Sequence, residues 1–261
     1  MTPKYLISRL FLAVGLTLAL SGGVQAQILD DLTVRVERGG ASSIWLDGRY
    51  RDIDFTWQRA AVTAGRGPFS LGLTYLRAEN QGSSMVPLWL IRGEESWVID
   101  VAYTRPLSWN TRLETTGNLV LSSDTFIDAP RLKSFSRVQA NVVFYHPDGM
   151  GWLRGAPLFP SSYVGTIVNE LGRVQGLVGA GTWWKGLGIY GVGFYSFNGI
   201  EDPWHPNDNP DSAIGFLQDA GVNLSASYTW RNLKLEVLRN IPLRRGAQDL
   251  NVTLQYRHFF R

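Results

Sequence analysis

The chain has 261 residues, of which 18% are charged, and it carries a net charge of only +3 and no cysteine. The lack of cysteine excludes a disulfide scaffold and a thiolate metal site. The small net charge, without a clustered basic stripe, gives no reason to expect nucleic acid as a partner.

The first 26 residues predict a secretory signal peptide. An apolar run covers residues 10–20 after a basic start, and Val24-Gln25-Ala26 is a suitable cleavage triplet. We therefore expect cleavage between Ala26 and Gln27, which leaves a mature domain of residues 27–261. An uncleaved anchor helix is the alternative, but the apolar run is shorter than the ~20 residues that a spanning helix needs. No later segment approaches that length without charge.

Alternation of apolar and polar residues, which is the period of a β-strand, recurs through the rest of the chain. In the first half it predicts strands within residues 32–37, 50–57, 69–75, 97–104, 112–121 and 137–144. Prolines, glycines and asparagines predict turns at 106–110 and 146–149. We expect loops at 77–95 and 122–133, and a linker at 59–68.

The strand predicted within residues 50–57 has one acidic and one apolar face, and the sequence must decide which of them meets water. Ile53, Phe55 and Trp57 alternate there with Asp52 and Asp54. Two carboxylates on one face are not expected to point into a dry core. We therefore assign Asp52 and Asp54 to the wet face and Trp57 to the apolar face.

The second half predicts a seventh strand within 151–156 and a loop at 157–173 with a short extended stretch at 163–168. A glycine-rich hairpin follows, from 174–184 and 187–197, with its turn at Lys185-Gly186. After an acidic, proline-rich loop at 198–213, the pattern predicts strands at 222–230 and 233–237, joined at 231–232. The closing strand, 249–261, alternates most clearly, with Leu250, Val252, Leu254 and Tyr256 on one face.

These elements add up to ten to twelve strands, and the lengths of their connections alternate. Successive connections of an up-and-down barrel lie at alternate ends. The four long polar loops all belong to one end, and four of the five connections at the other end are short. Outer-membrane barrels have short turns at one end and long loops at the other, and their aromatic residues gather at the two membrane interfaces. The sequence therefore predicts an all-β fold, a closed antiparallel transmembrane β-barrel of about twelve strands with both termini in the periplasm.

The polar residues opposite the apolar rows are expected to line the lumen. A barrel of this size leaves a narrow lumen rather than a porin-sized channel. The candidate lining residues are Arg35, Asp52, Asp54, Asp100, Arg112, Glu114, Arg137, Gln139, Asn141, Lys234, Glu236 and Arg257, together with Glu37, Asn223 and Gln255.

The signal peptide, the repeated alternation and the aromatic closing strand (Leu254-Gln255-Tyr256-Arg257-His258-Phe259-Phe260) resemble bacterial outer-membrane β-barrel proteins. Such proteins typically end on an aromatic residue, whereas this chain has Arg261 after Phe260. The resemblance implies residence in the cell outer membrane. It also implies outer-membrane lipids, lipopolysaccharide and the barrel-assembly machinery as partners.

Three functions remain open. The first is a narrow channel for small polar solutes, or a structural or surface barrel without passage. The second is an outer-membrane lipid-hydrolysing enzyme of the phospholipase or lipid A deacylase type, which requires a histidine close to a nucleophilic serine. Only His146, His205 and His258 are available, without that pattern, so we assign no catalytic residue. The third is a soluble periplasmic β-barrel or lipid-binding protein.

The loop at 198–213 has many oxygen donors but lacks the spacing of an EF-hand calcium loop. A solvated outer loop is the favoured interpretation. We expect no cofactor and no metal.

Overall fold

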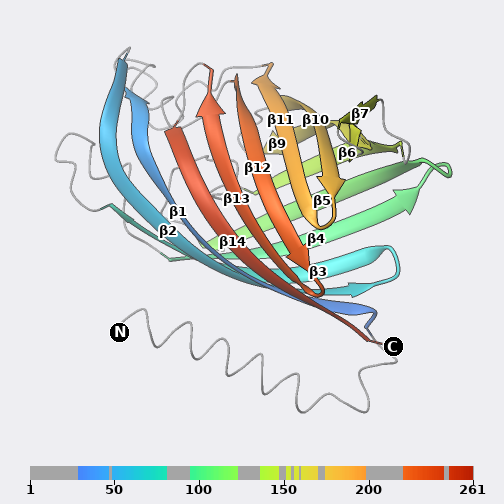
Figure 1. Ribbon diagram of the computed structural model, residues 1–261. Helices are drawn as coiled ribbons and strands as arrows, with labels where there is room; N and C mark the ends of the chain where they lie inside the picture. Colours follow the sequence, from blue (N-terminus) through green and yellow to red (C-terminus); the bar gives the residue numbers. More distant parts are fainter. Residues whose placement is uncertain are drawn as a thin grey trace.

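The computed structural model describes residues 29–46, 49–80, 95–122, 136–146, 151–153, 156–158, 160–169, 174–197, 220–243 and 247–260. Twelve strands form a closed barrel in which sequence neighbours pair and β1 pairs with β14 (Figure 1). The barrel strands are β1 (Asp31–Leu46), β2 (Arg49–Arg66), β3 (Phe69–Asn80), β4 (Glu95–Pro106), β5 (Thr111–Ser122), β6 (Arg137–Tyr145), β9 (Ser161–Asn169), β10 (Val174–Trp184), β11 (Leu187–Ser196), β12 (Ala220–Trp230), β13 (Leu233–Pro242) and β14 (Ala247–Phe259). The predicted fold is confirmed.

The apolar rows face outward. In β14, Leu250 and Val252 are 48% and 44% exposed, whereas Asn251 and Thr253 are 1% and 3% exposed. A water-soluble barrel would bury the leucine and valine and expose the amide and hydroxyl. Closure of the sheet pairs every strand with two neighbours, which is the condition for a sheet in lipid. No helix among the described residues is long and apolar enough to cross a membrane.

The two ends of the barrel differ, and we call them the turn end and the loop end. The turn end carries the two-residue turns at 67–68, 185–186 and 231–232 and the four-residue connection 107–110. Gly67, Lys185, Gly186 and Arg231 have positive φ angles, as tight hairpin turns require. The Phe260 amide donates to the Asp30 carbonyl at 3.0 Å, so the start of β1 and the end of β14 meet at the turn end. The predicted linker at 59–68 is wrong, because β2 continues to Arg66.

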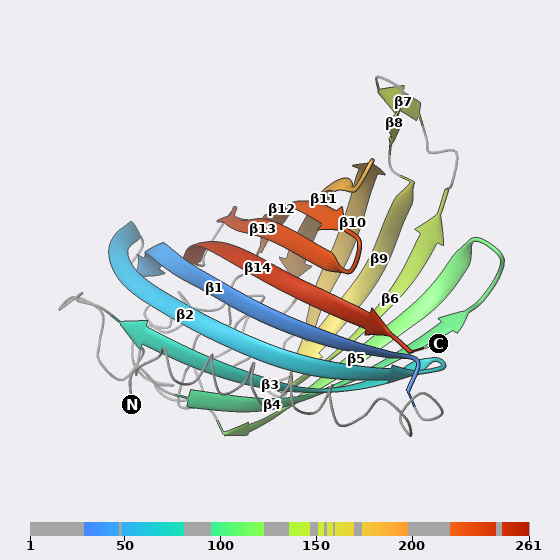
Figure 2. The same cartoon turned by 60° about the horizontal axis from the view of Figure 1, so that its bottom comes forward.

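The connection between β6 and β9 corrects the predicted order of strands. The seventh barrel strand is β9, within the predicted loop 157–173, and not the segment 151–156. Short strands β7 (Gly151–Leu153) and β8 (Ala156–Leu158) form a separate two-stranded sheet, and Figure 2 shows them beyond the ends of β6 and β9. Three residues are too few to cross a membrane, which takes about nine to eleven.

This connection lies at the turn end, so the predicted tight turn at 146–149 is only its beginning. The His146 amide donates to the Pro160 carbonyl at 2.7 Å, and this hydrogen bond joins the two ends of the connection. At the loop end, β9 and β10 are separated only by 170–173. The other long loops, at 81–94, 123–136 and 197–219, fall at the loop end as predicted.

Candidate solute pathway through the barrel

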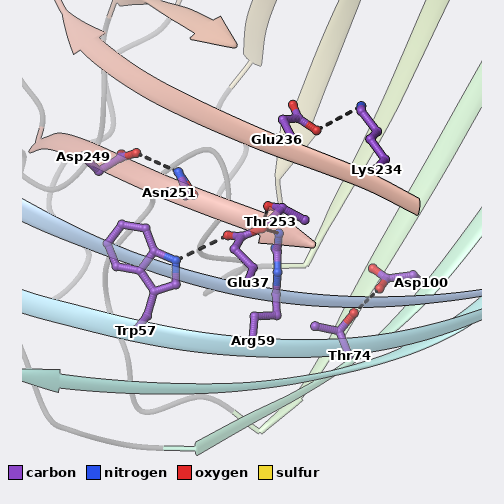
Figure 3. A network of polar contacts seen from close by, with 10 residues as sticks. All are labelled: Glu37, Trp57, Arg59, Thr74, Asp100, Lys234, Glu236, Asp249, Asn251 and Thr253. Carbon is purple, nitrogen blue, oxygen red and sulfur yellow. Dashed lines mark hydrogen bonds and ion pairs between the residues drawn. The ribbon is translucent and has the colours of Figure 1, made fainter. Parts of the chain in front are cut away.

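A buried polar cluster joins the first and last strands inside the barrel, and we call it the closure network. Its centre is the Glu37 carboxylate on β1, which accepts hydrogen bonds from Arg59 Nη2 on β2 at 2.5 Å and Thr253 Oγ1 on β14 at 3.1 Å. Trp57 Nε1 also donates to Glu37, at 3.4 Å. Figure 3 shows Trp57 and Arg59 of β2 and Thr253 of β14 pointing toward Glu37 of β1. The ion pair is dehydrated, since the Glu37 and Arg59 side chains are 0% and 4% exposed.

Trp57 corrects the predicted faces of β2. Its ring lies over Gly39 on the inner face, where an added Cβ on Gly39 would stand 2.3 Å from the indole. Arg59 and Ala61, two and four residues later, continue the inner row and are buried. The apolar residues that face outward on β2 are therefore Ala60 and Val62, one position out of phase with the prediction.

Asp52 accordingly lies on the outer face, since it is five positions from Trp57 along the strand. It pairs with Ser43, past an irregularity of β1 between Ala41 and Ser43, and it is exposed. Fourteen residues separate it from Arg66 at the turn end, which exceeds the length of a membrane-spanning strand. An outward carboxylate above the membrane meets water, so the premise that a wet face must be the lumen face fails here. The side chain of Asp54 lies outside the described residues.

The closure network continues across β13 and β14. Asp249 accepts hydrogen bonds from the Asn240 and Asn251 amides, both at 3.2 Å. All three residues are buried. The two amides thus satisfy both oxygens of this buried carboxylate with hydrogen bonds. The sequence prediction included none of these three among the lumen residues, although Asn251 lies on the predicted polar face of the closing strand.

A second set of polar residues, which we call the ladder, runs around the wall from β3 to β6. Thr74 Oγ1 and Asn118 Nδ2 each donate to Asp100 at 2.5 Å, and Arg137 Nε donates to Asn118 Oδ1 at 3.3 Å. Each member occupies a different strand, so the bonds link four strands in sequence. The structure thus brings together the predicted residues Asp100 and Arg137 through Asn118.

Gln139 and Asn141 occupy the row below Arg137 on β6. Gln139 Nε2 donates to Asn141 Oδ1 at 3.1 Å. Asn141 lies against Gly165 of β9, where a Cβ would stand 2.0 Å from the amide oxygen. Arg35 occupies the inner row of β1 opposite Gln255 and Ala61. Asn223 of β12 lies opposite Asn240.

Three ion pairs surround the lumen close to the turn end. They join Arg112 to Glu114 at 2.7 Å, Lys234 to Glu236 at 3.1 Å, and Arg257 to Asp31 at 2.6 Å. Unlike the closure network they are hydrated, with the three cationic side chains 51%, 37% and 48% exposed. We call them the mouth pairs.

The inner rows of the described strands carry balanced charge. Among inward-facing side chains that the structure describes, six are acidic and six are basic: Asp31, Glu37, Asp100, Glu114, Glu236 and Asp249, against Arg35, Arg59, Arg112, Arg137, Lys234 and Arg257. A lumen without net charge does not concentrate either sign of ion.

Two inward tyrosines were missed by the sequence prediction. Tyr163 of β9 lies over Gly179 and Tyr190 of β11 lies over Gly181, and the two rings are 6.0 Å apart. The neighbouring glycines of β10 make room for the rings, which fill the concave wall. The signal in the sequence was the glycine crowding of the hairpin, since a glycine within a strand often marks the close approach of a neighbour.

The described residues include no group of three or more His, Asp or Glu side chains able to hold a metal ion. His258 packs edge-on against Phe260, with ring centroids 4.8 Å apart. His205, the loop 198–213 and the predicted cleavage site at Ala26 and Gln27 lie outside the described residues.

The chain matches no protein-family model and no curated protein. Its fold is similar to that of a KdgM porin solved in complex with disordered oligogalacturonate, at 12% identity and a TM-score of 0.52, over 87% of this chain and 98% of the porin. It is also similar to an outer-membrane channel from Pseudomonas putida F1, at 11% identity and a TM-score of 0.49, over 89% and 96%. A third similar structure is the translocator domain of the autotransporter NalP from Neisseria meningitidis, at 10% identity and a TM-score of 0.47, over 97% and 96%.

The likeness to the KdgM porin agrees with the fold that the structure shows. The chain has the architecture of bacterial outer-membrane β-barrels, as the resemblance in its sequence implied.

Proposed function

We propose that this protein is an outer-membrane channel for small polar solutes of low net charge. The observation that carries the proposal is the contrast between the two sets of lumen charges. The mouth pairs are hydrated, with the Arg112 side chain 51% exposed, whereas Glu37 and Arg59 are dry. A lumen built only to hold the barrel together has no need of hydrated ion pairs around its entrance, because exposed pairs add little stability.

The ladder supports a polar path that leads away from the mouth. Asp100, Asn118 and Arg137 hold one another in place, so polar groups are fixed in position around the wall. Fixed polar groups can replace part of the hydration shell of a passing solute at little cost in reorganisation. The porin of similar fold was solved with oligogalacturonate, and we take from it only the general candidate of an elongated polar solute.

Balanced charge in the lumen restricts the solute class. Neither a polyanion nor a polycation gains from a lumen whose described charges cancel. Uncharged and zwitterionic solutes are therefore the preferred candidates.

The experiment is conductance of the purified barrel in a planar bilayer, combined with swelling of liposomes in uncharged sugars. We expect stable unitary steps, a reversal potential close to zero in a salt gradient, and swelling that falls with solute size. Absence of both conductance and swelling would contradict a channel.

A closed structural barrel is the second candidate, and one observation favours it. Trp57, Leu76 and Val98 are each 1% exposed on the inner faces of β2, β3 and β4, so part of the lumen is filled by apolar side chains. This candidate predicts silence in the same bilayer. Enzymatic hydrolysis would require fatty-acid release from phospholipid that is lost in a His146→Ala or His258→Ala variant.

A further inference from the structure

Arginines interrupt the outer apolar face of the barrel along one arc of the wall. On β13 the outward residues Leu235 and Val237 are followed by Arg239, and on β1 Val34 and Val36 are followed by Arg38. Arg239 lies opposite Leu250, and Arg38 lies opposite Val252, both outward residues of β14. Arg38 and Arg239 are exposed. Neither side chain points into the lumen.

A third arginine extends this arc. Arg77 lies on the outer row of β3, opposite Gln58 of β2, which in turn lies opposite Arg38. We call the three arginines Arg38, Arg239 and Arg77, together with the uncharged Gln58 between two of them, the outer basic row. Arg77 also lies opposite Glu95 of β4, so Arg38 and Arg239 are its principal members.

The row runs at a nearly constant height. Counted from the turn-end residue of their strands, Arg239, Arg38 and Arg77 lie six, seven and eight residues along β13, β1 and β3. At about 3.3 Å per residue this corresponds to roughly 20–26 Å of strand. A spanning strand has about nine to eleven residues, so the row lies just inside the outer boundary of the membrane. Arginine side chains at that depth extend toward the polar layer.

The residues around the row agree with this boundary. Trp97 of β4 is 40% exposed, and its ring lies 4.9 Å from that of Tyr75, which is on the same outward row of β3 as Arg77 but only 6% exposed. Aromatic residues of this kind mark the membrane interface. Toward the loop end, the next outward side chains on β2 are polar, as at Thr56 and the exposed Asp52. The outer surface therefore changes from apolar to basic to polar within a few residues.

The spacing suits a phosphate. Arg38 and Arg239 are separated by one strand, and their partners on β14 are two residues apart. With about 4.8 Å between neighbouring strands and about 3.3 Å per residue, their backbones are roughly 12 Å apart. Two arginine side chains can converge over that distance on one phosphate group or on two adjacent ones, and guanidinium groups bind phosphate through paired hydrogen bonds.

We propose that the outer basic row binds the phosphate groups of a phosphorylated glycolipid, lipopolysaccharide, in the outer leaflet. Charge complementarity and the height of the row select this occupant. Uncharged lipids offer no counter-charge, and a soluble anion offers nothing to the apolar residues below the row. The proposal does not depend on passage of solutes through the lumen.

The experiment measures binding of lipopolysaccharide to the full-length barrel in detergent, as the increase in its unfolding temperature and as lipid phosphate retained after washing. The test variant is Arg38→Gln/Arg239→Gln. The matched control is Arg231→Gln, which changes an exposed outer arginine at the turn end, where it lies 5.1 Å from the Trp230 ring. A second arm uses chemically dephosphorylated lipopolysaccharide.

We expect the double variant to bind lipopolysaccharide at least tenfold more weakly than the wild type does, and the control to bind it like the wild type. The wild type should bind dephosphorylated lipopolysaccharide as weakly as the double variant binds the intact lipid. Equal binding by the double variant, or undiminished binding of dephosphorylated lipid, would overturn the proposal. Folding of the double variant is checked by heat-modifiable migration. If it does not fold, the single variants Arg38→Gln and Arg239→Gln should each weaken binding several-fold. Unchanged binding by both single variants would overturn the proposal. Conductance of all variants should be unchanged.

Discussion

Thr253 Oγ1 of β14 donates a hydrogen bond to the Glu37 carboxylate of β1 at 3.1 Å, across 216 residues of sequence. This bond lies inside the seam where the barrel closes. The same carboxylate holds Arg59 of β2, so one acidic residue connects the last, first and second strands. Since an isolated buried charge is costly, the seam is stable only when all three strands are in register.

Removal of the Glu37 charge should therefore destabilise the barrel strongly. In Glu37→Gln the Arg59 guanidinium stays buried without its carboxylate, and we expect a loss of about 3–5 kcal/mol in the free energy of unfolding. The measurement is urea-induced unfolding in lipid vesicles. The Glu37→Gln/Arg59→Gln variant should lose less than the sum of the single variants.

Arg257→Ala provides the matched control, because Arg257 also bridges β14 to β1, through Asp31, but is 48% exposed. The expected loss is below about 1 kcal/mol. Equal losses for Glu37→Gln and Arg257→Ala would show that burial of the ion pair is not what stabilises the seam.

Gly39 should not tolerate a side chain. Its added Cβ would stand 2.3 Å from the Trp57 indole, so Gly39→Ala must displace the ring from its hydrogen bond to Glu37. We expect a loss of about 1–3 kcal/mol, as for other overpacked sites, measured by the same unfolding method.

Gly117→Ala is the comparison, because nothing lies within 4 Å of an added Cβ at that position. It should leave stability unchanged or slightly improved. A neutral Gly39→Ala variant would contradict the inward placement of Trp57.

Charge changes at the mouth pairs should set ion selectivity. Arg112→Gln and Lys234→Gln each remove a cation from a hydrated pair near the turn end. The remaining carboxylates then attract cations, and the reversal potential in a salt gradient should shift toward cation selectivity. Glu114→Gln should shift it in the opposite direction, and all shifts should decrease at high ionic strength.

Single cysteines can establish the orientation of the barrel, because the natural chain contains no cysteine. Asp52 is exposed near the loop end and Ser108 is exposed in a turn-end connection. With the turn end in the periplasm, a membrane-impermeant maleimide should label Asp52→Cys in intact cells and Ser108→Cys only after permeabilisation. The reverse pattern would invert the proposed orientation and remove the outer-leaflet argument for the outer basic row.

Local patterns in the sequence predicted most of the fold and part of the lumen. On β5 and β6, alternation assigned Arg112, Glu114 and Arg137 to the inner face because leucine and valine rows left no other choice. On β2 the same reasoning failed, because that strand extends beyond the membrane. There Asp52 can face water on the outside, while Trp57 packs over Gly39 inside. The pathway role of the inner residues stays a proposal.

The amino-acid sequence by itself determined the two-residue period, the turn positions and hence the closed sheet, since these depend on residues close together in the chain. Only the tertiary structure decided that β9 rather than residues 151–156 completes the wall, and which charges meet inside. Pairs such as Arg59 with Glu37 and Thr253 with Glu37 depend on the register between strands and on closure of the sheet, and a local pattern carries no information on either.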